Sequence, residues 1–185
     1  VYAGQELGER GMEIEGFSGM DGRSSIFDYC AVRSLQAWTN HGKFDGKNLT
    51  SEQRELRAFY KQLLTLSRDN KAITEGKMFD LEYAQGEGFN KHEQYTYLRK
   101  SGDELLLFVL NFDDRQVEVD VRIPVEAFQY LKQREIPQAV ATDLLSGKAF
   151  TMSFTASDLV HVTLPAWTGK ILEIKKAEKQ KRGKK

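Results

Sequence analysis

The second half of the chain alternates apolar and polar residues with a period of two, the pattern of β-strands that bury one face. Between residues 117 and 123 every second residue is Val or Ile, and the residues between them are Glu, Asp and Arg. The alternation recurs over 95–99 and 160–164, and 105–112 is an almost continuous apolar run suited to a strand covered on both faces. A last strand is expected over 169–174 and a helical turn over 124–134. Strands recurring at intervals of roughly ten residues predict an antiparallel β-sandwich over 72–177.

One amphipathic helix is predicted before this region. Its apolar stripe, with the spacing of a buried face, consists of Leu56, Phe59, Tyr60, Leu63, Leu64 and Ser67. Thr50 is followed three residues later by Gln53, which is the pattern of a capping box at the start of a helix. Asp69 and Asn70 indicate its end. A single helix of this kind needs a second surface to cover its stripe.

Residues 1–50 show few regular periodicities. Six glycines between positions 4 and 22 are mixed with Glu and Asp, which is typical of a long surface loop. Apolar residues from Ile26 to Trp38 are expected to line a short helix or a packed turn. Val1 and Tyr2 read as the end of a strand, so we interpret the chain as cut from a larger domain. We therefore expect residues 1–45 to be poorly packed, or held by a second molecule, in the isolated chain.

The composition excludes several classes of function. Twenty-seven basic and 27 acidic residues cancel, so no nucleic-acid partner is expected. The basic end, 178–185, is predicted to be a disordered tail. A lone cysteine, Cys30, excludes an intramolecular disulfide, and three separated histidines match no metal-ligand spacing, so no metal or cofactor is expected. No stretch approaches the roughly 18 apolar residues of a membrane span, and the sequence indicates no cellular location.

The opening residues VYAGQE resemble the end of the eighth barrel strand in the α-amylase family of glycoside hydrolases. In that family a small apolar run is followed by Tyr-x-Gly-x-Glu, and Tyr2, Gly4 and Glu6 occupy these positions. Five further segments follow in the family's order and resemble its eighth barrel helix, its linker and the strands of its C-terminal domain. They are 51–68, 73–81, 95–112, 144–148 and 164–174. The resemblance covers nearly the whole chain.

The resemblance implies a division into three parts. Residues 1–71 would be the remnant of a catalytic (β/α)8 barrel: the end of its last strand, a long loop and its final helix. Residues 72–177 would be the complete C-terminal all-β sandwich, followed by the tail. The fold class implied is mainly β, a sandwich of the α-amylase C-terminal type preceded by the barrel remnant. Since such barrels carry their active sites at the C-terminal ends of the strands, the loop over 3–23 would border the substrate cleft.

No catalytic residue is assigned to this chain. Retaining glycoside hydrolysis needs two carboxyl groups about 5–5.5 Å apart, and the resemblance implies that the family's nucleophile, acid/base and third aspartate all precede residue 1. Tyr2, Gly4 and Glu6 are assigned only to the border of the cleft. Glu6 either orients a neighbouring group at the cleft floor or braces its loop through backbone N–H groups, and the bracing role is favoured. Tyr2 is expected to pack in the barrel rather than stack on a sugar.

Other residues admit a functional and a structural interpretation, and the structural one is favoured for each. Four aromatic residues could stack on glucose rings but are expected to be buried: Phe17, Phe27, Tyr29 and Trp38. Cys30 is interpreted as a small apolar filler. Asn48-Leu49-Thr50 fits a glycosylation acceptor but is better explained by the helix cap. Trp167 is expected to pack at the sandwich edge rather than form a surface platform for a glycan.

Three functions are compared. The leading one is the C-terminal fragment of a retaining, α-amylase-type enzyme that acts on α-glucosidic bonds of starch-like glucans, inactive when separated from its barrel. The alternative is a carbohydrate-binding module without enzymatic activity. The third, favoured for residues 72–177, is a purely structural role in stabilising the enzyme. The α-glucan is the expected partner of the parent enzyme, and exposed barrel-facing surface would allow the isolated chain to self-associate.

Overall fold

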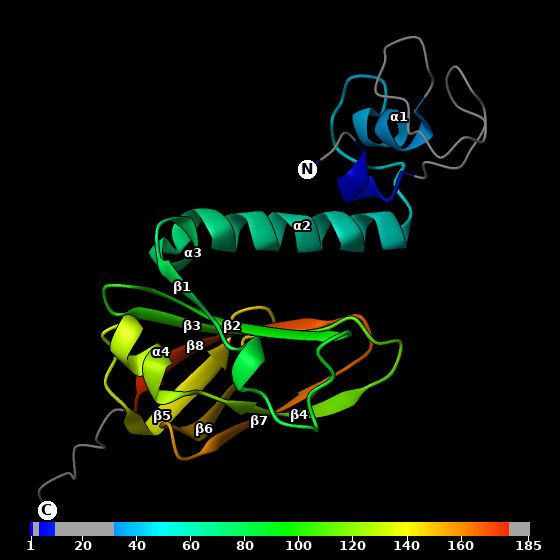
Figure 1. Ribbon diagram of the computed structural model, residues 1–185. Helices are drawn as coiled ribbons and strands as arrows, with labels where there is room; N and C mark the ends of the chain where they lie inside the picture. The colour runs from blue at the N-terminus through cyan, green and yellow to red at the C-terminus, as the bar shows by residue number, and fades with distance from the viewer. Residues whose placement is uncertain (2–3, 10–31, 178–185) are drawn as a thin grey trace, which may run out of the picture. The chain divides into compact units, whose positions relative to one another are not determined.

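The computed structural model of the protein describes residues 1, 4–9 and 32–177 (Figure 1). The chain divides into two compact units, Val1–Thr65 and Leu66–Lys185, and each is described by itself. The division falls inside helix α2 (Ser51–Asp69), shortly before the domain boundary expected at residue 71. Several predictions fall outside the described residues, namely those for Tyr2, Phe17, Phe27, Tyr29, Cys30 and the tail.

The first unit contains the short helices η1 (Gln5–Leu7) and α1 (Arg33–Thr39) and the greater part of α2. Trp38 of α1 is half-buried, and the Arg57 guanidinium carbon lies 3.7 Å from its ring centroid. On another side the ring approaches Gly46, where an added Cβ would lie 2.8 Å from ring carbons. Trp38 is therefore a packing residue, as expected.

The predicted capping box opens α2. The Thr50 N–H donates to Oε1 of Gln53 at 3.0 Å, and the Gln53 N–H donates to Oγ1 of Thr50 at 3.2 Å. This reciprocal pair confirms the helix-cap interpretation of Thr50. The Asn48 amide donates to Oδ1 of Asn40 at 2.8 Å, so it also has a structural partner. The helix ends at Asp69, as predicted, and the Asn70 side chain donates to the Leu66 carbonyl at 2.9 Å.

The apolar stripe of α2 is not buried. Within α2, all of which the structure describes, no residue is buried, and Phe59 and Leu64 are 45% and 54% exposed. The spacing of the apolar residues predicted the helix correctly, but the stripe is more exposed than a buried face would be. The spacing shows which side of a helix is apolar and does not show whether another surface covers that side. Exposure of part of the stripe agrees with the behaviour expected of the chain in isolation.

The second unit is an antiparallel β-sandwich, as predicted (Figure 1). Six strands form one sheet in the order β1 (Lys77–Asp80), β2 (Gln94–Ser101), β3 (Glu104–Asn111), β8 (Gly169–Lys176), β5 (Ile136–Asp143) and β6 (Ala149–Phe154). β4 (Val117–Arg122) and β7 (Leu159–Leu164) pair with each other as a second sheet. The remaining elements are α3 (Lys71–Thr74), η2 (Glu82–Ala84) and α4 (Val125–Tyr130).

The core lies between these two sheets. In the second sheet Val119 pairs with Val162 and Val121 pairs with Val160, and all four side chains point into the core. The residues that alternate with them are exposed, so the period of two read from the sequence is the real face pattern of β4 and β7. The buried side of α4, including Phe128, packs against the same core.

Strand β3 is buried on both faces, as its apolar run predicted. Its core side carries Leu105, Leu107 and Val109. Leu106 and Phe108 are buried on the opposite side, where Tyr97 of β2 stacks on Phe108 with ring centroids 4.4 Å apart and planes 6° apart. A strand with two apolar faces can be stable only where both faces are covered.

Helix α3 lies against β2 and β3. Arg99 of β2 holds it by donating from Nε to the Ala72 carbonyl at 2.7 Å and from Nη2 to the Gly76 carbonyl at 2.8 Å. The Ala72 N–H donates to the Glu104 carboxylate at 2.9 Å. Gly76 has no room for a side chain, because an added Cβ would lie 2.2 Å from the Ala72 carbonyl oxygen.

Removing the Phe154 side chain is expected to destabilise the sandwich. Phe154 is fully buried, and its ring meets the Phe128 ring edge-on at 5.2 Å. Phe154→Ala should lower the free energy of unfolding by about 3–5 kcal/mol, measured by urea denaturation with circular dichroism. The matched control is Phe112→Ala, since Phe112 is 54% exposed. Equal losses for the two variants would contradict this account of the core.

Removing the capping box is expected to weaken α2. Thr50→Ala should cost about 1 kcal/mol, because it leaves the Gln53 N–H without its side-chain acceptor. Thr65→Ala is the matched control, since Thr65 is an exposed residue within the same helix. Amide hydrogen exchange across the first turn should accelerate in the first variant and not in the second. Unchanged exchange in Thr50→Ala would refute the capping role.

Candidate functional site

Gly4 and Glu6, two of the three residues expected to border a cleft, lie in the turn around η1. Gly4 has φ +82°, and its carbonyl accepts the N–H groups of Leu7 and Glu9, both at 3.0 Å. An added Cβ at Gly4 would lie 2.8 Å from Cβ of Glu9, so glycine is required there for both space and backbone angle. Leu7 is fully buried and anchors the turn.

Glu6 lies in the first turn of η1 and is half-buried. The N–H groups of Leu7 and Glu9 donate to the Gly4 carbonyl, and the N–H of Gly8 donates to the Gln5 carbonyl. These three N–H groups therefore have backbone acceptors within the turn. The bracing role of Glu6 and its assignment to a cleft border both stay predictions.

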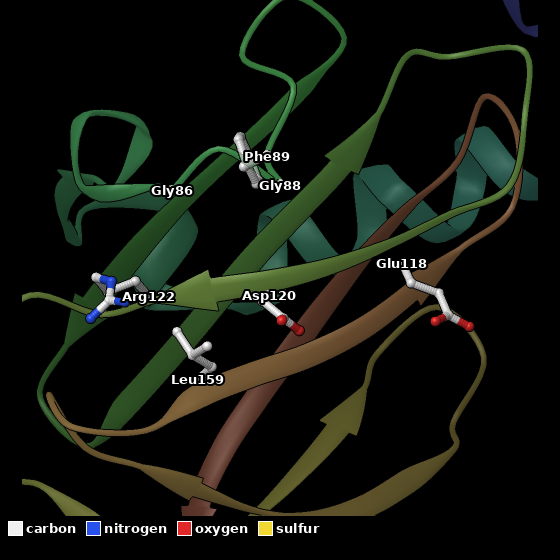
Figure 2. A pocket seen from close by; sticks show the side chains of 7 residues that line it. All are labelled: Gly86, Gly88, Phe89, Glu118, Asp120, Arg122 and Leu159. Carbon is white, nitrogen blue, oxygen red and sulfur yellow. The ribbon is translucent and has the colours of Figure 1, made fainter.

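On the sandwich, a surface groove of about 410 Å³ lies beside β4 (Figure 2). Its lining consists of Gly86, Gly88, Phe89, Glu118, Asp120, Arg122 and Leu159. The three charged residues follow one another along the outer face of β4, with Asp120 between the other two (Figure 2). The groove thus combines two carboxylates and a guanidinium.

The carboxylates of this groove lie on an open strand surface. Asp120 lies opposite His161 in the β4–β7 register, and its carboxylate is hydrogen-bonded to Nδ1 of His161. The Asp120 side chain is 58% exposed, and Glu118 is exposed on the same face of β4. We interpret the Asp120–His161 pair as a cross-strand surface contact.

Gln85 closes the rim of the sandwich next to this groove. It is 7% exposed, and its amide nitrogen donates to the carbonyls of Leu81 at 2.7 Å and Arg122 at 2.9 Å. Its amide oxygen accepts the Arg122 N–H at 2.9 Å. The side chain therefore ties the segment after β1 to the end of β4, and joins the two sheets by polar contacts.

Trp167 does not pack at the sandwich edge, and that prediction is wrong. The side chain is 69% exposed, and the residue has φ +54°, in the left-handed region. Two residues further along, β8 approaches β3 closely, since an added Cβ on Gly169 would lie 2.5 Å from Leu110.

Sequence reasoning missed a second group of exposed aromatic residues. Phe79 of β1 has ring-centroid distances of 6.3 Å to Tyr83 and 5.7 Å to Tyr130. Tyr83 and Tyr130 are 61% and 51% exposed, and the Lys77 ammonium lies 5.2 Å from the Tyr130 ring. Partial desolvation, with a smaller effect of Glu126, raises the pKa of Tyr83. These residues come from three separate elements, so no local pattern indicates the group.

Within the described part of the chain, no group of three or more His, Cys, Asp or Glu side chains is placed to hold a metal ion. Among the same residues, no helix combines the length and the apolar character that crossing a membrane requires.

Comparison with known proteins gives a match of fold. No model of a protein family matches the sequence. AmyP, solved as a variant bound to maltotriose, is 20% identical with a TM-score of 0.53, over 72% of this chain and 23% of that chain. An α-amylase from Anoxybacillus is 13% identical with a TM-score of 0.51, and the match covers 74% of this chain and 26% of that one. The α-amylase from Geobacillus thermoleovorans, complexed with acarbose, is 13% identical with a TM-score of 0.50, and the match covers 72% of this chain and 27% of that one.

The chain has an α-amylase-type fold. This confirms the fold that the opening motif and the five later segments implied. The chain spans about a quarter of the length of these α-amylase structures, between 23% and 27%. The match therefore concerns one part of each of those longer chains.

A side chain at Gly4 is expected to break the turn around η1. Gly4→Ala would force a strained φ and a contact with Glu9, and should cost about 1–2 kcal/mol locally. Amide exchange of Leu7 and Glu9, which donate to the Gly4 carbonyl, should accelerate roughly tenfold. Gly42→Ala is the matched control, since Gly42 has φ +85° but open space around it. Unchanged exchange at Leu7 in Gly4→Ala would refute the requirement for glycine.

Proposed function

We propose that the chain is the C-terminal portion of an α-amylase-type glycoside hydrolase that acts on α-glucosidic bonds of starch-like glucans. The observation that carries the proposal is the fold match, which covers 72% of this chain but 23% of AmyP. AmyP is solved with maltotriose and with maltose, and the Geobacillus enzyme with acarbose. Six family-like segments in the family's order support the same assignment.

Residues 1–71 act, in this proposal, as the final strand end, loop and helix of the catalytic barrel. The substrate cleft is then bordered by Tyr2, Gly4 and Glu6. Gly4 forms the tight turn in which Glu6 lies. The exposed stripe of α2 supports this role, because Phe59 and Leu64 require an apolar surface that the rest of a barrel would supply.

Residues 72–177 stabilise the enzyme and carry out no chemistry in this proposal. The outer face of the six-stranded sheet supports a packing role, since Tyr97, Phe108 and Ile171 present rings and aliphatic groups there. The groove beside β4 is a polar concavity on the sandwich, and its two carboxylates are exposed. Catalysis would accordingly depend on residues outside this chain.

The second candidate function is a carbohydrate-binding module. The observation that favours it is the exposed indole of Trp167, which the structural role leaves without a purpose. Binding and stabilisation are compatible, because the indole and the buried faces of the sheet use different surfaces of the sandwich.

The purified 185-residue chain is expected not to hydrolyse α-glucans. Incubation with maltoheptaose and with soluble starch should produce no reducing ends above a heat-treated sample, because the proposal places the catalytic carboxyl groups outside this chain. An active α-amylase assayed in parallel is the positive control. Extending the expressed chain upstream in its gene, to include a whole barrel, should confer hydrolysis. Turnover by the short chain, or none by the extended one, would contradict the proposal.

A further inference from the structure

We propose that the loops joining β3 to β4 and β7 to β8 form a surface binding site for an α-glucan, in which Trp167 stacks on a glucose ring. The class of ligand rests on the function proposed above. The location of the site rests only on the geometry of the sandwich, which places the two loops side by side: the Asn111 N–H donates to the Thr168 carbonyl at 2.8 Å, and the Trp167 N–H donates to the Asp113 carbonyl at 3.0 Å.

Trp167 combines two features that are unfavourable for folding. Its indole is 69% exposed, so this large aromatic side chain does not contribute the free energy that its burial would give. Its φ of +54° lies in the region that favours glycine, so its backbone is strained as well. Strained non-glycine residues that persist in a well-supported structure are concentrated at functional sites, where the strain places a side chain.

The scaffold under Trp167 is rigid. Asn111 is 1% exposed, and its amide nitrogen donates to the carbonyls of Arg115 and Pro165, each at 2.9 Å. Its amide oxygen accepts the Asp113 N–H at 3.0 Å. The Thr168 hydroxyl donates to the Pro165 carbonyl at 2.8 Å. One buried amide thus holds both loops, so the backbone that carries Trp167 is preorganised and little backbone entropy is lost on binding.

The surroundings of Trp167 match the two-sided chemistry of a sugar ring. A pyranose has a C–H face that packs on an aromatic ring and hydroxyl groups that need donors and acceptors. Arg115 is 78% exposed and lies 3.2 Å from the Asp113 carboxylate, and Asp114 is 74% exposed. Phe112, 54% exposed, adds an apolar side chain from the same loop. The site therefore offers aromatic faces together with a planar donor and a carboxylate acceptor.

The two other surface features of the sandwich offer less to a sugar. The groove beside β4 has charged groups, but its aromatic residue, Phe89, is 5% exposed and cannot stack on a ligand. Tyr83 and Tyr130 are exposed, but both pack at a tilt against Phe79 within their own cluster. On the sandwich, Trp167 joins an exposed ring to a hydrogen-bonded backbone and to a neighbouring loop that carries exposed polar side chains.

The test uses the whole chain and exploits its two tryptophans, Trp38 and Trp167. In the Trp38→Phe variant all tryptophan fluorescence comes from Trp167. Titration with maltoheptaose should change this emission in a saturable way. A parallel calorimetric titration of each variant gives the affinity, and cellohexaose, whose glucose units are β-linked, is the comparison ligand.

Trp167→Gly separates binding from folding. Because glycine suits φ +54° and the indole is exposed, this variant should melt at the same temperature as the wild type or higher. Its affinity for maltoheptaose should fall at least tenfold, equivalent to about 1.4 kcal/mol. Trp167→Tyr, which keeps an aromatic face, should remain within a few-fold of the wild type. Tyr83→Ala, in the other aromatic cluster, should bind normally.

Three results would overturn the proposal. Absence of saturable binding would eliminate the site and leave the proposed function intact, since that function has its own hydrolysis assay. Binding of cellohexaose in preference to maltoheptaose would refute the α-glucan as ligand. Self-association in sedimentation velocity that Trp167→Gly abolishes, without glucan binding, would show that the indole contacts a second copy of the chain.

Discussion

Strand β3 has to be covered on both of its faces, and the organisation of the sandwich follows from this requirement. Leu105, Leu107 and Val109 need the second sheet on one side. Leu106 and Phe108 need cover on the other, and Tyr97 and α3 supply part of it. An element with two apolar faces is typical of the middle layer of a larger protein. In the proposed stabilising role, the rest of the enzyme would cover the remaining apolar surface of the sandwich.

Elements with a strong local pattern could be predicted from the sequence. The capping box located the start of α2, and alternation located β2, β4 and β7. By contrast, β5 contains Pro137 and a shift of register between Ile136 and Ala139, which breaks the period of two. β1 is a four-residue edge strand within a segment assigned to a linker, and too short to show a period. Burial of the α2 stripe depends on a partner surface, which no residue of the helix encodes.

The candidate site was less predictable because its properties arise from tertiary contacts. Trp167 is exposed and has a left-handed backbone, whereas the neighbouring Pro165 and Gly169 indicated packing. The role of Asn111 depends on a hydrogen bond to Pro165, 54 residues away in the chain. Gly4 was singled out by its place in the family-like motif, and its positive φ explains why a glycine stands there.

The strand order has a consequence for how the protein is made. β8 follows every other strand in the sequence, yet it lies between β3 and β5 in the middle of the six-stranded sheet. During synthesis, β5 and β6 can pair as a hairpin, and so can β2 and β3, but the two halves cannot join until β8 has left the ribosome. Premature termination before Gly169 would therefore leave two unjoined hairpin sheets with open inner edges, which are templates for aggregation.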